Sequence, residues 1–392
     1  MSRHAPLRAL AAAMSLGALV LSGCVVAPRP CVAPGAPPVP HAEYAPVRWT
    51  DLPGWNADAQ QSVWRAFLAD CARIGRRAPW IAPCTAAQAT HPASAAQVRA
   101  FFERDFDPYA VSRRTGDQSD RYGLITGYFE PLLHGARSRS ARFGTPLYAP
   151  PPDLLSVDLG SLYPQLAGKR IRGRLIGHTV VPYYSRADLH LDPFVKGSAI
   201  VWVDDPLGAF FLEVQGSGKV ELPDGKVIRL HYADENGYPY RSIGRYLVSR
   251  GELQAGQATM LGIRLWARSH PAQVTALLDA DPSVVFFREV PLGDPALGPP
   301  GSLGLPLTPG RSIAVDPADI PLGAPVFLAT TDPDSGAPLQ RLVLAEDTGG
   351  AIRGPIRADL FWGAGARAAR AAGDMRQAGR LWLLWPKGAP LP

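Results

Sequence analysis

Residues 342–365 read LVLAEDTGGAIRGPIRADLFWGAG, and this stretch constrains the fold more than any other. Two short apolar runs, Leu342 to Ala345 and Ala358 to Phe361, flank a glycine-rich turn and predict two strands. Asp347 follows the first run closely, and Asp359 lies inside the second, beside aromatic residues. Burial beside aromatic rings raises the pKa of a carboxyl group, as a general acid requires. The stretch therefore predicts strands that carry a candidate acidic site.

A third aspartate, Asp316, ends the short apolar run 313–315 and precedes Pro317. Asp side chains commonly accept hydrogen bonds from the backbone of turns. A purely structural role therefore stays open for all three aspartates, and most of all for Asp316.

The chain of 392 residues contains 39 Gly and 41 Pro, a content typical of turn-dense β architecture. Helical spacing of apolar residues predicts helices within residues 55–107, whereas short strand patterns dominate from about Tyr122 onwards. Asp224-Gly225 predicts a hairpin turn. We therefore expect a mainly β fold with helices. Further strands are predicted at residues 124–129, 200–203, 209–214, 284–287, 325–329 and 381–384, and further helices at residues 241–250, 260–268 and 271–278.

The amino terminus has the pattern of an export signal. Two arginines precede the apolar run Ala9 to Leu21, which is too short to span a bilayer permanently. The small residues before Cys24 resemble a bacterial lipobox, so residues 1–23 are expected to be a lipoprotein signal peptide and Cys24 to be acylated. An ordinary signal peptide with an unmodified Cys24 is the alternative. Val25 after the cysteine favours the outer membrane, by resemblance to lipoprotein sorting.

Residues 24–45 are rich in Pro and Ala and are expected to form a tether between the anchor and the body. Cys31 lies in this tether and receives no role. Cys71 and Cys84 remain as a pair in an exported, oxidising setting, which favours a disulfide over two free buried thiols.

Several other chemistries are disfavoured. Gln215-Gly216-Ser217-Gly218-Lys219 lacks the spacing of a phosphate-binding loop, so we interpret it as a turn whose polar groups suit sugar hydroxyls, or as a plain tight turn. The eight His are scattered and no Cys-x-x-Cys occurs, so no metal and no cofactor are expected. No Gly-x-Ser-x-Gly elbow supports a serine hydrolase. The net charge of +6 is spread along the chain, so nucleic acid is not an expected partner.

Together the motifs resemble the membrane-bound lytic transglycosylase A family, lipoproteins that cut peptidoglycan glycan strands. The resemblance covers about residues 50–386. Four stretches carry it, in the family's order: Thr126 to Pro131, Phe211 to Gly218, Tyr240 to Gly244 and Asp347 to Gly365.

The resemblance implies a double-psi β-barrel built from residues 46–129 and 288–386, with its carboxy-terminal part named for three aspartates. It also implies a smaller β-rich domain inserted at residues 130–287 and a glycan groove between the two. The expected location is the outer membrane, facing the periplasm, with glycan strands and other cell-wall enzymes as candidate partners.

Carried over by position, Asp359 matches the catalytic acid and base of the family. The other matched positions are expected to bind substrate: Asp347, Asp316, Gln215, Ser217, Gly218 and Tyr128. The implied enzyme is a peptidoglycan lytic exotransglycosylase, a lyase that leaves 1,6-anhydromuramoyl ends. Two alternatives stay open, namely a glycoside hydrolase on the same fold and a non-catalytic lipoprotein that binds the cell wall.

Overall fold

The computed structural model describes residues 41–166, 169 and 171–392. The expected signal peptide, the acylated Cys24 and Cys31 lie outside the described residues. None of the helices in the described part of the chain combines the length and the apolar character that a bilayer crossing requires.

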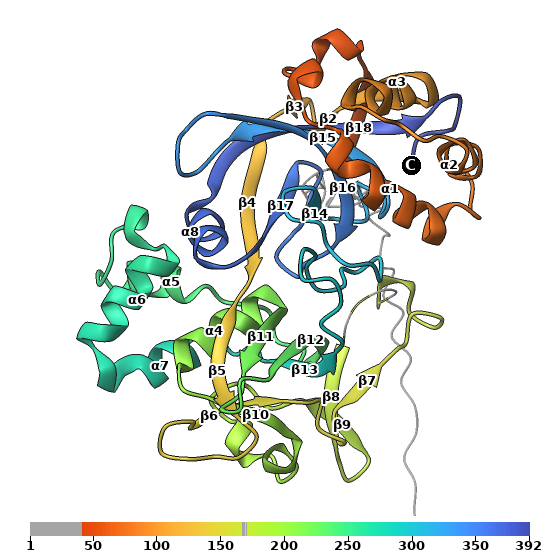
Figure 1. Cartoon of the computed structure of the whole chain (residues 1–392). Coiled ribbons are helices and arrows are strands. Elements are labelled where there is room, and N and C mark those ends of the chain that lie inside the picture. Colours follow the sequence, from red (N-terminus) through yellow and green to blue (C-terminus); the bar gives the residue numbers. More distant parts are fainter. Residues whose placement is uncertain (1–40, 167–168, 170) are drawn as a thin grey trace, which may run out of the picture. The chain divides into compact units, whose positions relative to one another are not determined.

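Six strands close into a barrel, because β18 pairs with a strand at each end of the ladder (Figure 1). The order around the ring is β18, β15, β16, β14, β17 and β4. The β14–β16 and β17–β4 pairs are parallel and the others are antiparallel. The bounds of the ring strands are Gly123–Glu130 (β4), Ser312–Val315 (β14), Pro325–Thr331 (β15), Pro338–Asp347 (β16), Arg357–Ala364 (β17) and Arg376–Pro386 (β18).

Three more strands extend the barrel sheet outward: β2 (Phe106–Thr115) pairs with β18, and β1 (His41–Pro46) and β3 (Gln118–Asp120) pair with β2. The tether expected to reach residue 45 therefore overlaps an ordered strand. The Pro/Ala-rich composition of residues 24–45 does not indicate the two features that order this strand. The backbone of β1 pairs with β2 along its whole length, and Tyr44 packs against the barrel core.

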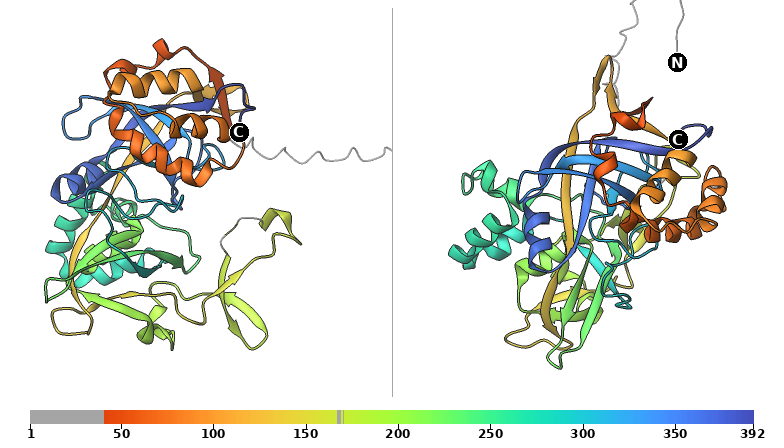
Figure 2. Two further views of the ribbon diagram at one scale, coloured as in Figure 1. Left: turned by 45° about the vertical axis from the view of Figure 1, so that its right-hand side comes forward. Right: turned by 45° about the horizontal axis from the view of Figure 1, so that its top comes forward.

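Three helices lie together beside the barrel (Figure 2), as the spacing of apolar residues predicts. They are α1 (Gln61–Ile74), α2 (Ile81–Gln88) and α3 (Ala95–Asp105). Their buried Phe67, Phe101 and Phe102 join the same core cluster as the inward residues of the barrel strands. A disulfide between Cys71 and Cys84 links α1 to α2, the pair that the sequence suggests.

The second sheet begins where β4 leaves the barrel. After Pro131 the chain continues as β5, which joins a separate six-stranded sheet of order β13, β12, β11, β5, β10 and β6 (Figure 1). The molecule therefore combines a six-stranded barrel with a separate insert sheet in a mixed α/β architecture, richer in helix than the mainly β fold we expect from sequence. The bounds of the second sheet are Leu132–Ala136 (β5), Thr145–Tyr148 (β6), Ala199–Val203 (β10), Ser217–Glu221 (β11), Val227–Glu235 (β12) and Val285–Val290 (β13).

The strand predicted at 209–214 is wrong, because these residues lie in helix α4 (Pro206–Gln215). The Asp205 side chain caps the helix by accepting a hydrogen bond from the Gly208 N–H, at 2.8 Å, and Pro206 occupies the first turn. Gly216 ends the helix with a φ of 75°. Residues 207–212 are all buried, so the helix has no polar face that could reveal its period.

The remaining elements complete the insert and the barrel. Helix α8 packs on β4 and β17, and β7, β8 and β9 form a small third sheet. Their bounds are Leu155–Val157 (β7), Ile171–Ile176 (β8), Thr179–Pro182 (β9), Ile243–Ser249 (α5), Met260–Ser269 (α6), Val274–Asp279 (α7) and Ala366–Asp374 (α8). Short 3-10 helices span Trp49–Asp51, Trp55–Ala57, Pro164–Leu166, Leu189–Leu191, Val195–Ser198, Ala255–Gln257 and Pro271–Gln273.

A buried ionic cluster joins the two sheets where β4 leaves the barrel. The Glu130 carboxylate accepts hydrogen bonds from Arg229 at 2.6 and 3.1 Å, and Lys219 Nζ lies 3.1 Å away. The side chains of Glu130 and Arg229 are 1% and 3% exposed. Arg229 also donates to the carbonyl oxygens of Leu292 and Leu297, on the segment that returns toward the barrel. One guanidinium thus ties the outgoing connection to the returning one.

We predict that Glu130→Gln lowers the free energy of unfolding by about 3–5 kcal/mol, because it leaves the buried Arg229 and the half-buried Lys219 without a counter-charge. Glu289→Gln is the matched control. Glu289 forms a bidentate ion pair with Arg137, and both side chains are more than 40% exposed. That change is expected to cost about 1 kcal/mol or less. Urea unfolding followed by tryptophan fluorescence measures the free energy of unfolding of both variants. Equal losses in the two variants would contradict the stabilising role given to the buried ionic cluster.

Candidate functional site

The pairing of four adjacent strands places Asp347 and Asp359 in one row of paired residues across the barrel sheet. We call this row, formed by Asp347, Ala314, Asp359 and Thr126, the aspartate rung. Ala314 of β14 pairs with Asp347 of β16 on one side and with Asp359 of β17 on the other. Asp359 in turn pairs with Thr126 of β4. Neighbouring strands are about 4.8 Å apart, so the Cα atoms of the two aspartates lie about 10 Å apart. Ala314 occupies the position between them in this row of paired residues.

The alternation along β17 decides which way Asp359 faces. Ala358 and Leu360 are fully buried in the main core. Because successive side chains of a strand point to opposite faces, Asp359 and Phe361 face the other way. On that face Phe361 belongs to a separate apolar cluster with Tyr128 and Ala314, and Asp359 is half-buried among them.

Asp359 is held by a single hydrogen bond. The Thr126 hydroxyl donates to Oδ1 at 2.7 Å, and within the described residues nothing donates to Oδ2. Burial raises the pKa of Asp359 to about 6, although the nearby Arg357 and the Thr126 hydrogen bond lower it; the charge of Asp347 raises it further. A carboxyl group with this pKa holds a proton at mildly acidic pH and can donate it from Oδ2.

Asp347 has very different surroundings. Its Oδ1 accepts hydrogen bonds from the N–H and the hydroxyl of Ser302 and from the N–H of Thr348, each at 2.9 Å. Its Oδ2 accepts from the Tyr128 hydroxyl at 3.0 Å. Burial raises the pKa of Asp347, whereas these four donors lower it. Asp347 is therefore the better stabilised carboxylate of the two.

Tyr128 interacts electrostatically with both aspartates. It is 7% exposed, and its ring contacts that of Phe361 at a centroid distance of 5.2 Å. Burial raises the pKa of Tyr128 well above its ordinary value, and the charges of Asp347 and Asp359 add to this effect. Tyr128 thus stays protonated and acts as a hydrogen-bond donor to Asp347.

Asp316 stands at the end of β14 and holds a loop rather than facing the other two aspartates. Its Oδ2 accepts a hydrogen bond from the Gly354 N–H at 2.9 Å, and Arg353 lies 3.9 Å from its Oδ1. These partners belong to the segment that connects Asp347 to Asp359. These contacts fit the structural role that the sequence left open for Asp316, in which its side chain accepts hydrogen bonds from the backbone of a turn.

The motif around Gln215 is explained largely by packing. The Gln215 side chain accepts a hydrogen bond from the N–H of Phe129 at 2.9 Å, next to Tyr128. Ser217 and Gly218 are buried at the start of β11. A Cβ on Gly218 would lie 2.5 Å from Leu212, so only glycine fits there. The structure therefore brings Gln215 to β4 beside the aspartate rung and shows Gly218 packed against α4.

Sequence reasoning missed Thr126, Ser302 and Arg357. Thr126 had a detectable signal, because it lies two residues before Tyr128 in the same strand and so shares its face. Ser302 had none, since it precedes Asp347 by 45 residues in a loop.

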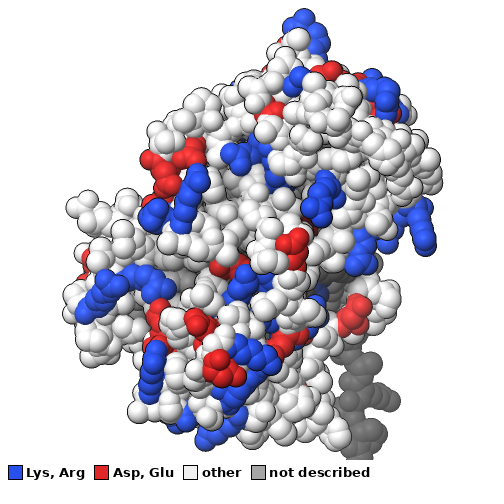
Figure 3. Space-filling view, in the orientation of Figure 1, with Lys and Arg blue, Asp and Glu red and all other residues white. Residues whose placement is uncertain are grey.

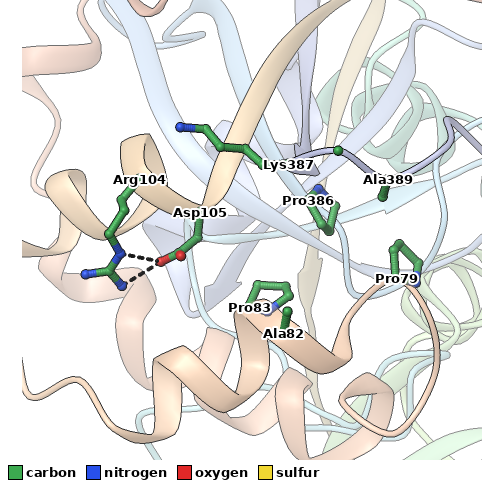
Figure 4. A pocket seen from close by; sticks show the side chains of 9 residues that line it. Pro79, Ala82, Pro83, Arg104, Asp105, Pro386, Lys387 and Ala389 are labelled. Carbon is green, nitrogen blue, oxygen red and sulfur yellow. Dashed lines mark hydrogen bonds and ion pairs between the residues drawn. The ribbon is translucent and has the colours of Figure 1, made fainter.

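Other features of the described part of the chain do not indicate a different functional site. A pocket of about 300 Å³ lies near the ends of α2, α3 and β18, where Arg104 pairs with Asp105 beside Lys387 (Figure 4). It contains none of the predicted site residues. Positive and negative side chains are interspersed over the face in Figure 3, consistent with the spread of charge along the chain. Among the described residues there is no cluster of three or more His, Cys, Asp or Glu arranged to hold a metal ion.

Two family models match the chain. The one described as the MltA specific insert domain matches residues 124–288, and the one described as the 3D domain matches residues 311–385. Membrane-bound lytic murein transglycosylase A of Escherichia coli K12 is 30% identical over 296 residues, which cover 73% of this chain and 72% of the relative.

Solved structures are similar over nearly the whole chain. The crystal structure of MltA from Neisseria gonorrhoeae in its monoclinic form has a TM-score of 0.76 and 35% identity, and the match covers 92% of this chain and 98% of that one. The crystal structure of E. coli MltA with bound chitohexaose has a TM-score of 0.61 and 25% identity, covering 89% and 92%. That relative therefore binds an oligosaccharide on the same fold.

We predict that two substitutions move the pKa of Asp359 in opposite directions. Thr126→Val removes a donor to the carboxylate and raises the pKa, whereas Asp347→Asn removes a neighbouring negative charge and lowers it. Carbon-13 NMR titration of the Asp359 carboxyl carbon in the full chain measures both shifts, with the unsubstituted chain as reference. Shifts of the same sign would contradict the geometry of this rung.

Proposed function

The chain belongs to the membrane-bound lytic murein transglycosylase A family, and we propose that it cleaves the β-1,4 bond between N-acetylmuramic acid and N-acetylglucosamine in peptidoglycan without water. The observation that carries this proposal is Asp359. It is a half-buried carboxyl group whose pKa burial raises to about 6, it lies on the face of β17 turned away from the main core, and among the described residues nothing donates to its Oδ2. A lytic transglycosylase needs one group that is first an acid and then a base, and Asp359 has the properties for both steps.

In the first step protonated Asp359 gives its proton to the glycosidic oxygen, which leaves with the N-acetylglucosamine. The N-acetylmuramic acid ring then carries oxocarbenium-like charge at C1. In the second step the Asp359 carboxylate removes the proton of that ring's C6 hydroxyl, whose oxygen bonds to C1. The product has a 1,6-anhydromuramoyl end, and Asp359 is protonated again.

This cycle differs from hydrolysis in needing no water and no second carboxylate as nucleophile. The attacking hydroxyl belongs to the reacting ring, so its effective concentration is high. Asp347 lies across Ala314 from Asp359 and is held by four donors. In the proposal it stays ionised, favours the proton on Asp359 and stabilises positive charge on the ring.

We propose that the glycan strand lies in a groove between the barrel and the insert sheet, and that the barrel has the double-psi topology. The chitohexaose-bound E. coli relative supports an oligosaccharide site on this fold. Tyr128 and Gln215 are assigned to that groove because they flank the aspartate rung. Ser217, Gly218, Asp347 and Asp316 complete the proposed substrate-binding set, Asp316 through the loop that it holds.

The cellular setting is also a proposal. The lipobox-like sequence before Cys24 supports acylation there and an outer-membrane lipoprotein that faces the periplasm. Relatives are named as membrane-bound. The match of the insert-domain model to residues 124–288 supports an inserted domain at about residues 130–287 between the barrel segments 46–129 and 288–386, with β1 added to the first.

The test is digestion of purified peptidoglycan by the full chain in detergent, with the fragments analysed by mass spectrometry. We expect fragments lighter by one water than hydrolytic products. Asp359→Asn is expected to reduce their formation by about 10²–10⁴-fold, because the variant has neither acid nor base at the reacting bond.

Asp334→Asn is the matched control, since Asp334 is exposed in a turn of the same barrel and should leave the rate unchanged. Reducing-end fragments of full mass would instead favour the hydrolase. A folded chain that binds peptidoglycan but releases no fragments would favour the non-catalytic lipoprotein.

A further inference from the structure

Ser302 supplies two of the four donors to Asp347, although it lies on a loop outside the barrel strands. Its N–H and its hydroxyl each donate to Asp347 Oδ1 at 2.9 Å. The hydroxyl oxygen also lies 2.7 Å from the Thr348 hydroxyl and accepts from the Thr348 N–H at 3.2 Å. Ser302 is exposed, so these contacts are not a by-product of core packing.

The loop that carries Ser302 is fixed on both sides of this residue. The N–H of Leu303 donates to the carbonyl oxygen of Glu346 at 3.0 Å, and the Arg73 guanidinium of α1 donates to the carbonyl oxygen of Gly304 at 3.1 Å. A Cβ on Gly301 would lie 2.5 Å from the Glu346 carbonyl oxygen, so the backbone there must approach closely. Ser302 is therefore held in position before any substrate arrives.

The ionisable groups that act on Asp347 come from three strands. Tyr128 donates to it from β4, Asp359 acts on it across Ala314 from β17, and Glu346 precedes it in β16. Beyond these, Glu346 faces Asp70 of α1, and Arg357 lies near Asp359. In their ionised forms Asp359 and Glu346 both oppose a negative charge on Asp347, so that charge depends on the donors that surround Asp347.

We propose that Ser302 is a positioning residue whose N–H and O–H hold Asp347 as a carboxylate, so that the reactive proton resides on Asp359. The inference rests on the proposed function for its consequence in catalysis. Its structural part, the ionisation of Asp347, is independent of any activity. Arg73 of α1 holds the loop that carries Ser302, through its hydrogen bond to the Gly304 carbonyl oxygen.

Ser302→Ala tests this, because it removes the hydroxyl and keeps the backbone donor. Carbon-13 titration of the Asp347 carboxyl carbon in the full chain should show its pKa raised by about one unit, the size expected for losing a hydrogen bond to a charged group. In peptidoglycan digestion the acidic limb of the pH–rate profile should move to higher pH by a similar amount. Ser302→Thr keeps a hydroxyl and should restore both values.

Ser335→Ala is the matched control. Ser335 also donates to an aspartate through its N–H and its hydroxyl, both to Asp332 at 3.0 Å, but in an exposed turn away from the rung. It should change neither the Asp347 titration nor the profile. An unchanged Asp347 pKa in Ser302→Ala would overturn the proposal, as would a rate loss of equal size at every pH. Absence of anhydro products from the unsubstituted chain would overturn the proposed function instead, while the titration would still decide the role of Ser302.

Discussion

The register of four neighbouring strands is the constraint on which the site depends. Because β14 lies between β16 and β17, and β17 pairs with β4, the residues Asp347, Ala314, Asp359 and Thr126 share one rung. A shift of one residue in any of these pairs would turn the carboxyl groups into the apolar core. Closure of the barrel by β18 opposes such a shift, since it leaves no free edge along which the ring could slip.

Two aspartates on the same rung have different chemistry because their donors differ. Within the described part of the chain Asp347 accepts four hydrogen bonds, whereas Asp359 accepts one and has apolar neighbours. Desolvation acts on both groups, so the donors decide which of them holds the proton. The division of roles between acid and carboxylate therefore follows from the loops and strands around the rung, not from the residue type.

Much of the fold was predictable from local pattern. The helices before residue 107, the hairpin at Asp224-Gly225 and most strands follow from apolar spacing and turn residues. Helix α4 was not predictable from its apolar run, because a segment buried on all sides has no period, although its Asp205 cap and Gly216 stop were present. Strand β1 was hidden by a Pro/Ala composition, since its order comes from pairing with β2.

By itself the sequence determined the aspartates, the glycine-rich turns and the family resemblance, because each is a matter of residue type in a fixed order. The tertiary structure alone decided which donors meet which carboxylate. Thr126 precedes Asp359 by 233 residues and Ser302 precedes Asp347 by 45, and only strand pairing and loop packing bring them together. The interactions that set a pKa act over a few ångströms, so they depend on distances that a linear sequence does not contain.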